Sequence, residues 1–249
     1  MSPTDNPPAT DIDTDEALKG RLLAVRDRIR HACSTAQRAS DSVALLAVSK
    51  TFGADRVVAL ARAGQREFAE NYLQEALDKI GRCEALGLAL HWHFIGPIQS
   101  NKTRPIAEHF DWVHSVDRLK IAIRLDEQRP ASRAPLQVCV QVNVSGEASK
   151  SGCAPQEAVE LALAVARCER LRLRGLMTIP EPTTDPELQR RRFAMLRELH
   201  ARIRAQLPQA DRAGFDTLSM GMSDDLEAAI LEGATVVRVG TAIFGRRQP

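Results

Sequence analysis

The 249-residue chain is poor in aromatic residues and has no long apolar segment. Aromatic residues make up 4% of it, and Tyr72 is the only tyrosine. No stretch approaches the roughly 18 consecutive apolar residues that suggest a membrane span, which excludes a membrane-spanning helix. At 44% hydrophobic and 27% charged residues, the composition is globular and excludes a wholly disordered or collagen-like chain. The length allows one large domain or two modest ones.

The chain also lacks C-x-x-C pairs, a signal peptide and an excess of either charge. The N-terminus has neither the basic nor the apolar segment of a secretory signal. Five widely spaced cysteines without an obvious activating neighbour indicate reduced thiols in a cytosolic protein, and we assign none of them as a nucleophile. A formal net charge of +2 predicts no general affinity for nucleic acid. Arg190, Arg191 and Arg192, with Glu187 and Glu198 nearby, are typical of a solvated helix face.

Alternating strand and helix patterns fill most of the chain. Residues 1–15 are rich in Pro, Asp and Thr and are expected to form a disordered acidic tail. Helical spacing of apolar residues from Glu16 predicts a long helix to about Ala39, and nearly continuous apolar runs then predict buried parallel strands. The expected strands are 43–49, 67–69, 90–95, 112–115, 136–144, 171–178, 217–220 and 235–239. The expected helices among them are 54–63, 71–85, 100–109, 116–128, 155–168, 186–206 and 226–231.

Eight strands that alternate with helices predict an α/β fold, a single (β/α)₈ TIM-type barrel over residues 16–249 with an extra N-terminal helix. The chain ends too soon after the eighth strand for a full eighth helix, and the N-terminal helix is expected to cover that gap. A doubly wound open sheet is the alternative. No G-x-G-x-x-G follows the first strand, so dinucleotide binding lacks support.

Function in such a barrel lies at the carboxyl ends of the strands. Lys50 ends the first strand, where it either reaches solvent or points into the barrel mouth. Partial burial there would favour a neutral amine that can form a Schiff base with a carbonyl compound.

The loops after strands seven and eight indicate a phosphate site, as is frequent in these barrels. Ser223 and Thr241 offer hydroxyl groups, and Gly240 allows a close approach of the backbone. Arg238 either forms a salt bridge within the barrel, points outward, or serves a ligand. A lysine, a phosphate cradle and a cation suit pyridoxal 5'-phosphate, although aldol chemistry uses a lysine and a phosphate cradle as well.

Seven ordered segments carry a resemblance to a known family. They are LLAVSKTF at 45–52, EFAENYLQEA at 67–76, HWHFIGPIQSNK at 91–102, HSVD at 114–117, VNVSGEASKSG at 142–152, GLMTIP at 175–180 and LSMGMSDDLEAAILEGATVVRVGTAIFG at 218–245. With these, the chain resembles the YggS/PROSC family of pyridoxal phosphate homeostasis proteins over about residues 16–245. That family is related to the barrel domain of alanine racemases.

The resemblance implies a role for each matching position. Lys50 matches the lysine that forms a Schiff base with the cofactor. Ser223, Gly240 and Thr241 fall where the phosphate is held, with Met222 beside them, while Asn71 and His93 fall in motifs that line the barrel mouth. Arg238 matches the arginine that faces the pyridine nitrogen. Because an arginine disfavours a protonated ring beside it, this residue suits a weak catalyst or a racemase and not a transaminase.

The resemblance further implies a cytoplasmic, non-catalytic protein of vitamin B6 homeostasis that holds pyridoxal phosphate on Lys50 for carriage or exchange. Its expected partners are the cofactor and apoenzymes that receive it, without nucleic acid or membrane, and a monomer is expected. A racemase is the alternative, but it needs a second base, which relatives take from a second domain. A Schiff-base aldolase is a third possibility. His91 and His93 face one side of a strand, yet no third metal ligand follows at a convincing spacing.

Overall fold

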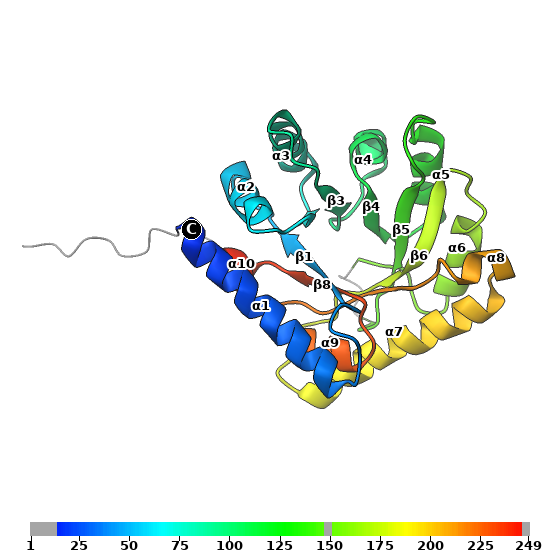
Figure 1. Cartoon of the computed structure of the whole chain (residues 1–249). Helices are drawn as coiled ribbons and strands as arrows, with labels where there is room; N and C mark the ends of the chain where they lie inside the picture. Colours follow the sequence, from blue (N-terminus) through cyan, green and yellow to red (C-terminus); the bar gives the residue numbers. More distant parts are fainter. Residues whose placement is uncertain (1–13, 147–150, 246–249) are drawn as a thin grey trace, which may run out of the picture.

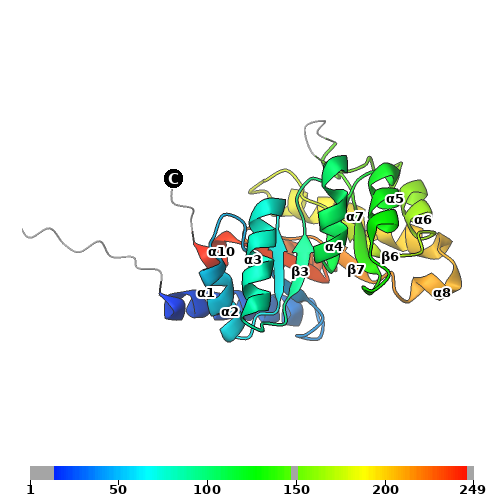
Figure 2. The same cartoon turned by 90° about the horizontal axis from the view of Figure 1, so that it is seen from above.

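The structure, a computed structural model, describes residues 14–146 and 151–245. Eight parallel strands close into a barrel, each pairing with the next, and the eighth pairs with the first (Figures 1 and 2). The strands are β1 (Ala44–Val48), β2 (Glu67–Glu70), β3 (His91–Phe94), β4 (Trp112–Val116), β5 (Leu136–Gln141), β6 (Leu171–Met177), β7 (Thr217–Ser219) and β8 (Val236–Val239). The prediction of a (β/α)₈ barrel is confirmed, and the open doubly wound sheet is wrong.

Helices surround the barrel on its outer side (Figure 2). They are α1 (Asp15–Thr35), α2 (Ala54–Arg62), α3 (Leu73–Ala85), α4 (Thr103–His109), α5 (Leu119–Gln128), α6 (Ala158–Val165), α7 (Pro186–Gln206), α8 (Gln209–Arg212), α9 (Leu226–Leu231) and α10 (Thr241–Phe244). A short 3₁₀ turn, Ser100–Lys102, precedes α4, so the helix expected from residue 100 starts later. The short α8 and α10 were not expected from the sequence, because a single turn carries little helical periodicity.

Helix α1 packs beside α10, the single-turn helix that follows β8, and so covers the region where the sequence predicted no full eighth helix. Its first turn is capped by the Thr14 hydroxyl, which accepts a hydrogen bond from the Ala17 amide. Apolar residues at helical spacing bury one face of α1, which packs against α2, α9 and α10 (Figure 1). Arg21 Nε donates to the Ile243 carbonyl at 2.6 Å and ties α1 to α10. The helix ends at Thr35, earlier than the expected Ala39.

The predicted boundary between tail and barrel shifts slightly. Asp15 was expected in the tail but is the first residue of α1. The rest of the expected tail, up to residue 13, lies outside the described residues.

Two apolar cores hold the barrel together. The larger one fills the space between the strands and the helices, where side chains such as Phe68 and Phe193 are fully buried. Burial of each such side chain stabilises the fold by roughly 1.5–3 kcal/mol. The smaller core lies among the strands and consists of Leu46, Val48, Ala69, Ile95 and Val236. Polar side chains occupy the rest of the barrel interior.

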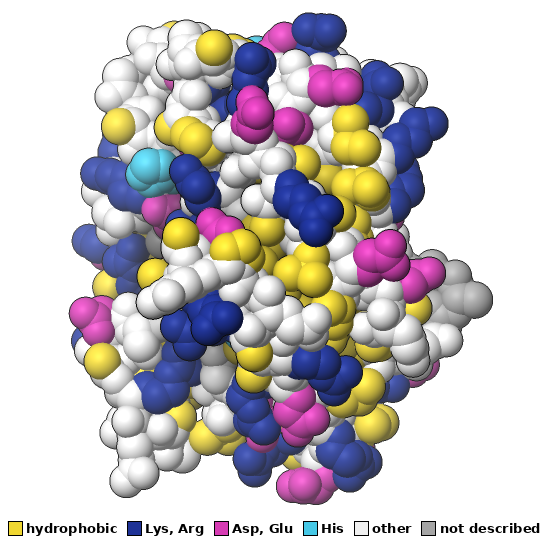
Figure 3. Space-filling view, turned by 90° about the vertical axis from the view of Figure 1, so that its right-hand side faces the viewer, with side chains coloured by type: hydrophobic (Ala, Val, Ile, Leu, Met, Phe, Trp, Pro, Cys, Tyr) yellow, Lys and Arg dark blue, Asp and Glu magenta, His cyan; other side chains and the backbone are white. Residues whose placement is uncertain are grey.

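The surface in Figure 3 carries basic and acidic side chains intermixed, with hydrophobic ones between them. The three consecutive arginines of α7 are engaged in ion pairs: Arg190 pairs with Glu232, Arg191 with Asp185, and Arg192 with Glu181. None of the described helices combines the length and the apolar character that a bilayer crossing requires.

Candidate functional site

Lys50 lies two residues after the end of β1, at the carboxyl end of the barrel. Leu46 and Val48 belong to the apolar cluster inside the barrel, and side chains along a strand alternate between its two faces. Lys50, two residues beyond Val48, continues the inward-facing series. Its half-buried position therefore agrees with the predicted amine at the barrel mouth.

The loops after β7 and β8 bring two hydroxyl groups together. Thr241 Oγ1 lies 3.1 Å from Ser223 Oγ, and the Ala242 amide donates to Ser223 Oγ at 3.4 Å. The backbone of β8 also bonds to the loop after β7, since the Arg238 amide donates to the Gly221 carbonyl. Two hydroxyls and one amide thus converge next to β8, a set of donors suited to an anion.

Gly240 places these groups close to Lys50. Strands β1 and β8 pair in register, with Leu46 opposite Arg238. Beyond this paired stretch, a Cβ on Gly240 would lie 3.3 Å from the Val48 carbonyl oxygen, tighter than ordinary contact. The close approach expected at Gly240 is therefore an approach to β1. It brings the Ser223 and Thr241 hydroxyls beside the strand end that carries Lys50.

Met222 contributes to the shape of its loop. Its amide donates to Asp225 Oδ1 at 2.6 Å, so this N–H closes a turn before α9. Burial raises the pKa of Asp225, and this hydrogen bond opposes the rise. The contact of Met222 with a cofactor remains a prediction.

Arg238 is a buried cation without a carboxylate partner among the described residues. It is 2% exposed, and its Nη1 and Nη2 donate to Ser219 Oγ and to the Thr178 carbonyl, both at 2.8 Å. Burial lowers its pKa to about 10. Of the alternatives open from the sequence, an outward arginine and a salt-bridged one are both wrong. A buried charge that hydrogen-bonds only to neutral groups is costly, even with the attraction of the Asp225 carboxylate at longer range, which makes Arg238 a functional candidate.

A chain of hydrogen bonds leads from Arg238 through the barrel interior. Ser219 Oγ lies 2.8 Å from His114 Nδ1, and His114 Nε2 lies 2.9 Å from His93 Nδ1. His93 Nε2 then lies 2.7 Å from Glu67 Oε2 at the start of β2. The chain therefore joins the site region to the opposite end of the barrel.

The structure places His93 differently from the expected mouth position. It is 3% exposed, both of its ring nitrogens are hydrogen-bonded, and its ring stacks on Trp112. Burial lowers its pKa. Because β3 continues past it to Phe94, His93 lies within the strand and below the rim. These contacts weigh against direct contact of His93 with a cofactor.

Asn71 lies just after β2, at the expected rim. Its side-chain Oδ1 is buried without a hydrogen-bond partner among the described residues. The backbone leaves no space beside it, because a Cβ on Gly96 would lie 2.2 Å from the Asn71 carbonyl oxygen. An unpartnered buried acceptor costs free energy, so a ligand that donates to it would be favoured.

Three charged residues near Lys50 were not foreseen. Lys79 of α3 contacts the carboxylates of Glu70 and Glu75, and the cluster holds the backbone around Lys50. Glu70 and Glu75 lie in a motif used for the resemblance, and Glu75 and Lys79 have the four-residue spacing of a helix ion pair. That spacing is the sequence signal from which the ion pair could have been predicted.

The part of the chain that the structure describes gives no reason to assign a metal site or a cysteine nucleophile. Within residues 14–146 and 151–245, no group of three or more His, Cys, Asp and Glu side chains is placed to hold a metal ion. All five cysteines are free. Burial raises the pKa of Cys139 and of Cys153 to about 12, which disfavours the reactive thiolate.

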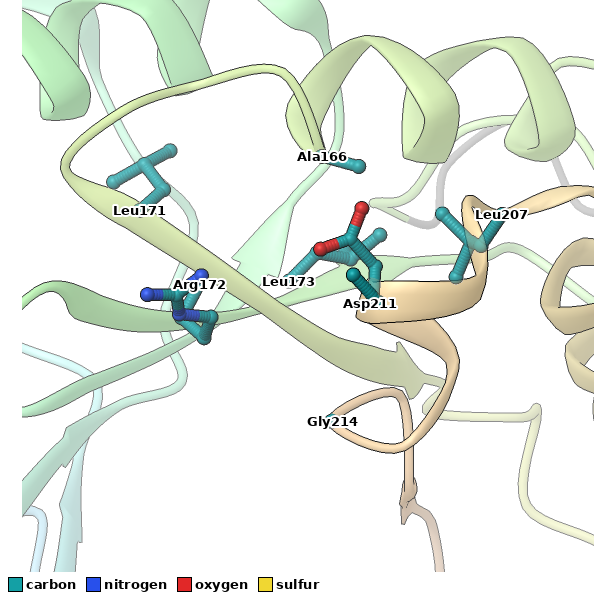
Figure 4. A pocket seen from close by; sticks show the side chains of 8 residues that line it. Ala166, Leu171, Arg172, Leu173, Leu207, Asp211 and Gly214 are labelled. Atoms are coloured by element: carbon teal, nitrogen blue, oxygen red, sulfur yellow. The ribbon is translucent and has the colours of Figure 1, made fainter.

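A surface pocket at the opposite end of the barrel is separate from this site. Leu171 and Leu173, at the amino-terminal start of β6, line it together with Leu207, which follows α7, and Asp211 of α8 (Figure 4). Parallel strands have all their carboxyl ends on one side, so Lys50 and this pocket lie at different ends of the barrel.

Comparisons with known proteins agree with the fold. The family model of the alanine racemase N-terminal domain matches residues 25–248. The chain is 63% identical over 226 residues to the pyridoxal phosphate homeostasis protein of Pseudomonas aeruginosa, covering 91% of this chain and 94% of that one. It is 51% identical over 230 residues to the Escherichia coli protein of the same name, covering 91% and 95% of the two chains.

Solved structures show the same relationship. PipY of Synechococcus elongatus, in a structure with PLP bound, is 35% identical with a TM-score of 0.78, covering 92% of this chain and 100% of PipY. Alanine racemase of Corynebacterium glutamicum has a TM-score of 0.68 at 15% identity, covering 94% of this chain and 62% of the racemase, and shows the shared fold alone. The chain belongs to the family built on the alanine racemase N-terminal domain and, within it, to the pyridoxal phosphate homeostasis proteins.

Proposed function

We propose that this protein binds pyridoxal 5'-phosphate at the carboxyl ends of its strands and serves vitamin B6 homeostasis in the cytoplasm. Lys50 holds the cofactor as a Schiff base for carriage or exchange. One observation carries the proposal: Lys50, the Ser223–Thr241 hydroxyl pair and the buried Arg238 all belong to the adjoining strands β1, β7 and β8 and the loops that follow them. The PLP-bound structure of PipY supports it.

The donors present fit a phosphate monoester. The Thr241 hydroxyl and the Ala242 amide both donate to Ser223 Oγ, and the two hydroxyl groups can rotate their hydrogens toward an anion, beside the fixed N–H of Ala242. The fit extends to the ring, because Arg238 supplies a cation that forms no direct ion pair with a carboxylate of the described residues, and Asn71 Oδ1 supplies an acceptor without a partner among them.

The bound cofactor supplies an aldehyde, and Lys50 supplies the amine. After Lys50 Nζ loses a proton to solvent, it forms a C=N bond to the aldehyde carbon, and the aldehyde oxygen leaves as water. Addition of water reverses this reaction and frees Lys50. No oxidant or reductant is needed, so the same residue serves capture and release.

Arg238 favours storage over catalysis. An arginine cannot take a proton from the ring nitrogen, and its positive charge disfavours a second cation beside it. The ring then withdraws electrons weakly and assists carbanion formation poorly. We therefore propose a non-catalytic carrier that passes the cofactor to apoenzymes and is active as a monomer.

Borohydride trapping tests this function. Protein loaded with pyridoxal phosphate should show a visible absorption band that borohydride removes, leaving a stable mass increase on one peptide. Among the six lysines, Lys19, Lys50, Lys79, Lys102, Lys120 and Lys150, the label should map to Lys50 alone. Lys50→Ala should lose the label and keep part of the phosphate-dependent binding, while Lys102→Ala should behave as wild type. A label that persists in Lys50→Ala, or protein that takes up no cofactor, contradicts the proposal.

The same preparation separates the carrier from the racemase and the aldolase. Chiral analysis of alanine and serine after long incubation should show no turnover on the scale of enzymes, roughly 1–1000 per second. Such turnover would identify a racemase and overturn the carrier proposal. Aldol activity without bound cofactor would identify the third possibility.

A further inference from the structure

A buried ion-pair cluster lies behind the backbone of Lys50. It consists of Glu70 at the end of β2 and of Glu75 and Lys79 on α3, and these three residues are called the clamp. The Lys79 side chain is 4% exposed and the Glu70 side chain 0%. Lys79 Nζ lies 2.7 Å from Glu70 Oε1 and 2.5 Å from Glu75 Oε1. Neither carboxylate belongs to the cofactor-binding positions named above.

The clamp holds both peptide groups that flank Lys50. Lys79 Nζ donates to the Ser49 carbonyl at 2.7 Å, which fixes the peptide group before Lys50. The Thr51 amide donates to Glu75 Oε1 at 2.6 Å, which fixes the peptide group after it. The Ser49 hydroxyl adds a third contact by donating to Glu70 Oε1 at 2.6 Å.

The held backbone has an unfavourable conformation. Thr51 has a φ of +70°, in the left-handed region that a β-branched residue rarely adopts. Such a residue persists only where its surroundings enforce the conformation, and these positions cluster at functional sites. The turn is closed by the Phe52 amide, which donates to the Ser49 carbonyl at 3.1 Å, and the bond from the Thr51 amide to Glu75 is the side-chain contact that supports it directly after Lys50.

Stability alone is a poor reason for this arrangement. Burial raises the pKa of Glu70, against the opposing effect of Lys79, and Glu70 Oε2 has no hydrogen-bond partner among the described residues. Well-packed apolar residues are often as stabilising as a buried ion pair. The contacts of the clamp with the Lys50 backbone offer a positional reason.

We propose that Glu70, Glu75 and Lys79 are positioning residues that set the backbone turn at Lys50 and so aim its amine at the cofactor aldehyde. The clamp acts through the backbone and touches no cofactor. This inference rests on the proposed function, because it concerns the rate at which Lys50 captures the aldehyde. Poor alignment of an attacking group slows a reaction without weakening ligand binding to the same extent.

Glu75 gives the sharpest test, because its side chain is 30% exposed and its loss endangers folding least. Glu75→Ala removes the acceptor for the Thr51 amide, and we expect capture of pyridoxal phosphate to slow by roughly 10- to 100-fold. Glu75→Gln keeps an oxygen at the same position and should stay within about threefold of wild type, on the same alignment argument. Stopped-flow absorbance measures capture. Titration with pyridoxine 5'-phosphate, which has no aldehyde, measures binding alone and should change less than about threefold.

A second substitution tests the backbone route. Glycine adopts positive φ without strain, so Thr51→Gly in the Glu75→Ala background should restore at least part of the capture rate. Glu84→Ala, an exposed glutamate on the same helix, is the matched control and should capture at the wild-type rate.

The outcomes distinguish a failure of the positioning role of the clamp from a failure of the proposed function. If wild type captures the aldehyde on Lys50 while Glu75→Ala captures it equally fast, the clamp is overturned and the function stands. The positioning role of the clamp is also overturned if Glu75→Ala weakens capture and pyridoxine 5'-phosphate binding equally, or if Glu75→Gln loses as much capture as Glu75→Ala. It is overturned as well if Thr51→Gly restores none of the capture rate. If wild type captures no aldehyde, the proposed function itself fails.

Discussion

His93 Nδ1 and His114 Nε2 lie 2.9 Å apart inside the barrel, and their neighbours determine which of the two donates. Arg238 can only donate and the Glu67 carboxylate can only accept, so two neutral rings leave one consistent order, in which Ser219 Oγ accepts from Arg238 and donates to His114 Nδ1. His114 then carries its proton on Nε2 and donates to His93 Nδ1. His93 in turn donates from Nε2 to Glu67. All four hydrogen bonds run in one direction, from the cation to the carboxylate.

The ring protons of His93 and His114 can be measured. Burial lowers the pKa of both residues, and that of His114 falls well below its usual value. We expect both rings to be neutral at pH 7 with the proton on Nε2. The ¹⁵N chemical shifts of the labelled protein report this state, with His93→Gln and His114→Gln assigning the signals. A protonated Nδ1 on either ring at pH 7 would contradict the derived direction.

Arg238→Met should separate ligand binding from stability. The pKa of about 10 means that the buried charge costs on the order of 3 kcal/mol, since one pKa unit corresponds to roughly 1.4 kcal/mol. Methionine removes this cost but leaves Ser219 Oγ and the Thr178 carbonyl without their donor, at about 1 kcal/mol each. We expect the free energy of unfolding in urea to change by less than about 2 kcal/mol, because these effects offset each other. Affinity for pyridoxine 5'-phosphate should fall at least about tenfold with the loss of a charged donor.

Arg129→Met is the matched control for that substitution. Arg129 is 3% exposed and donates to the Ala107, Phe110 and Ala134 carbonyls, among elements remote from Lys50. Its loss should leave the affinity unchanged. A large stability loss in Arg238→Met with unaltered affinity would mean that Arg238 is structural.

The barrel could be predicted because its signals are local. Apolar runs and helical spacing repeat along the chain, and each repeat identifies one strand or helix without knowledge of the others. Lys50 was found in the same way, because the residue that follows a buried strand must lie at the rim. Helix boundaries were less accurate: the segment at Ala154 turns, with its amide bonded to Glu157 Oε2, before α6 begins at Ala158.

The hydrogen-bond chain and the clamp could not be predicted because they join distant parts of the sequence. His114 and Ser219 are 105 residues apart, and no periodicity connects them. Lys79 reaches the Ser49 carbonyl across 30 residues, from a helix to a strand end. For His93, a sequence motif predicted a position near the barrel mouth. Its ring instead lies in the barrel interior, hydrogen-bonded to Glu67 at the start of β2.

The Ser223 and Thr241 hydroxyls should matter only for ligands that carry a phosphate. A hydrogen bond to a charged group contributes roughly 1.5–3 kcal/mol, so Ser223→Ala and Thr241→Val should each weaken pyridoxine 5'-phosphate binding by roughly 10- to 100-fold. Binding of unphosphorylated pyridoxine should stay unchanged in both. Thr35→Val, at the exposed end of α1, is the control and should alter neither affinity. Equal weakening of both ligands would place the phosphate elsewhere.

His200 should make the fold sensitive to acid, far from the cofactor site. Its ring stacks on Phe215 at 4.3 Å between centroids, and its buried Nε2 has no hydrogen-bond partner among the described residues. Burial lowers its pKa to about 4. The unfolded chain takes up this proton near pH 6.5, before the folded protein does. The stability that the neutral ring provides above pH 6.5 is therefore lost as the pH falls toward 4, by up to about 1.4 kcal/mol per pH unit.

His200→Phe removes both the titrating group and the unpartnered nitrogen while keeping a ring against Phe215. We expect a gain in the free energy of unfolding of about 1 kcal/mol at pH 8, because an unsatisfied buried nitrogen is removed. The advantage over wild type should grow by roughly 2 kcal/mol at pH 5, where the unfolded histidine is protonated. Urea unfolding at the two pH values measures both quantities. His200→Leu separates titration from stacking, since it should reduce the pH dependence to the same extent without the gain at pH 8. If the pH dependence of wild type and His200→Phe is the same, His200 is protonated in the folded protein as readily as in the unfolded chain, and the assigned burial effect is wrong.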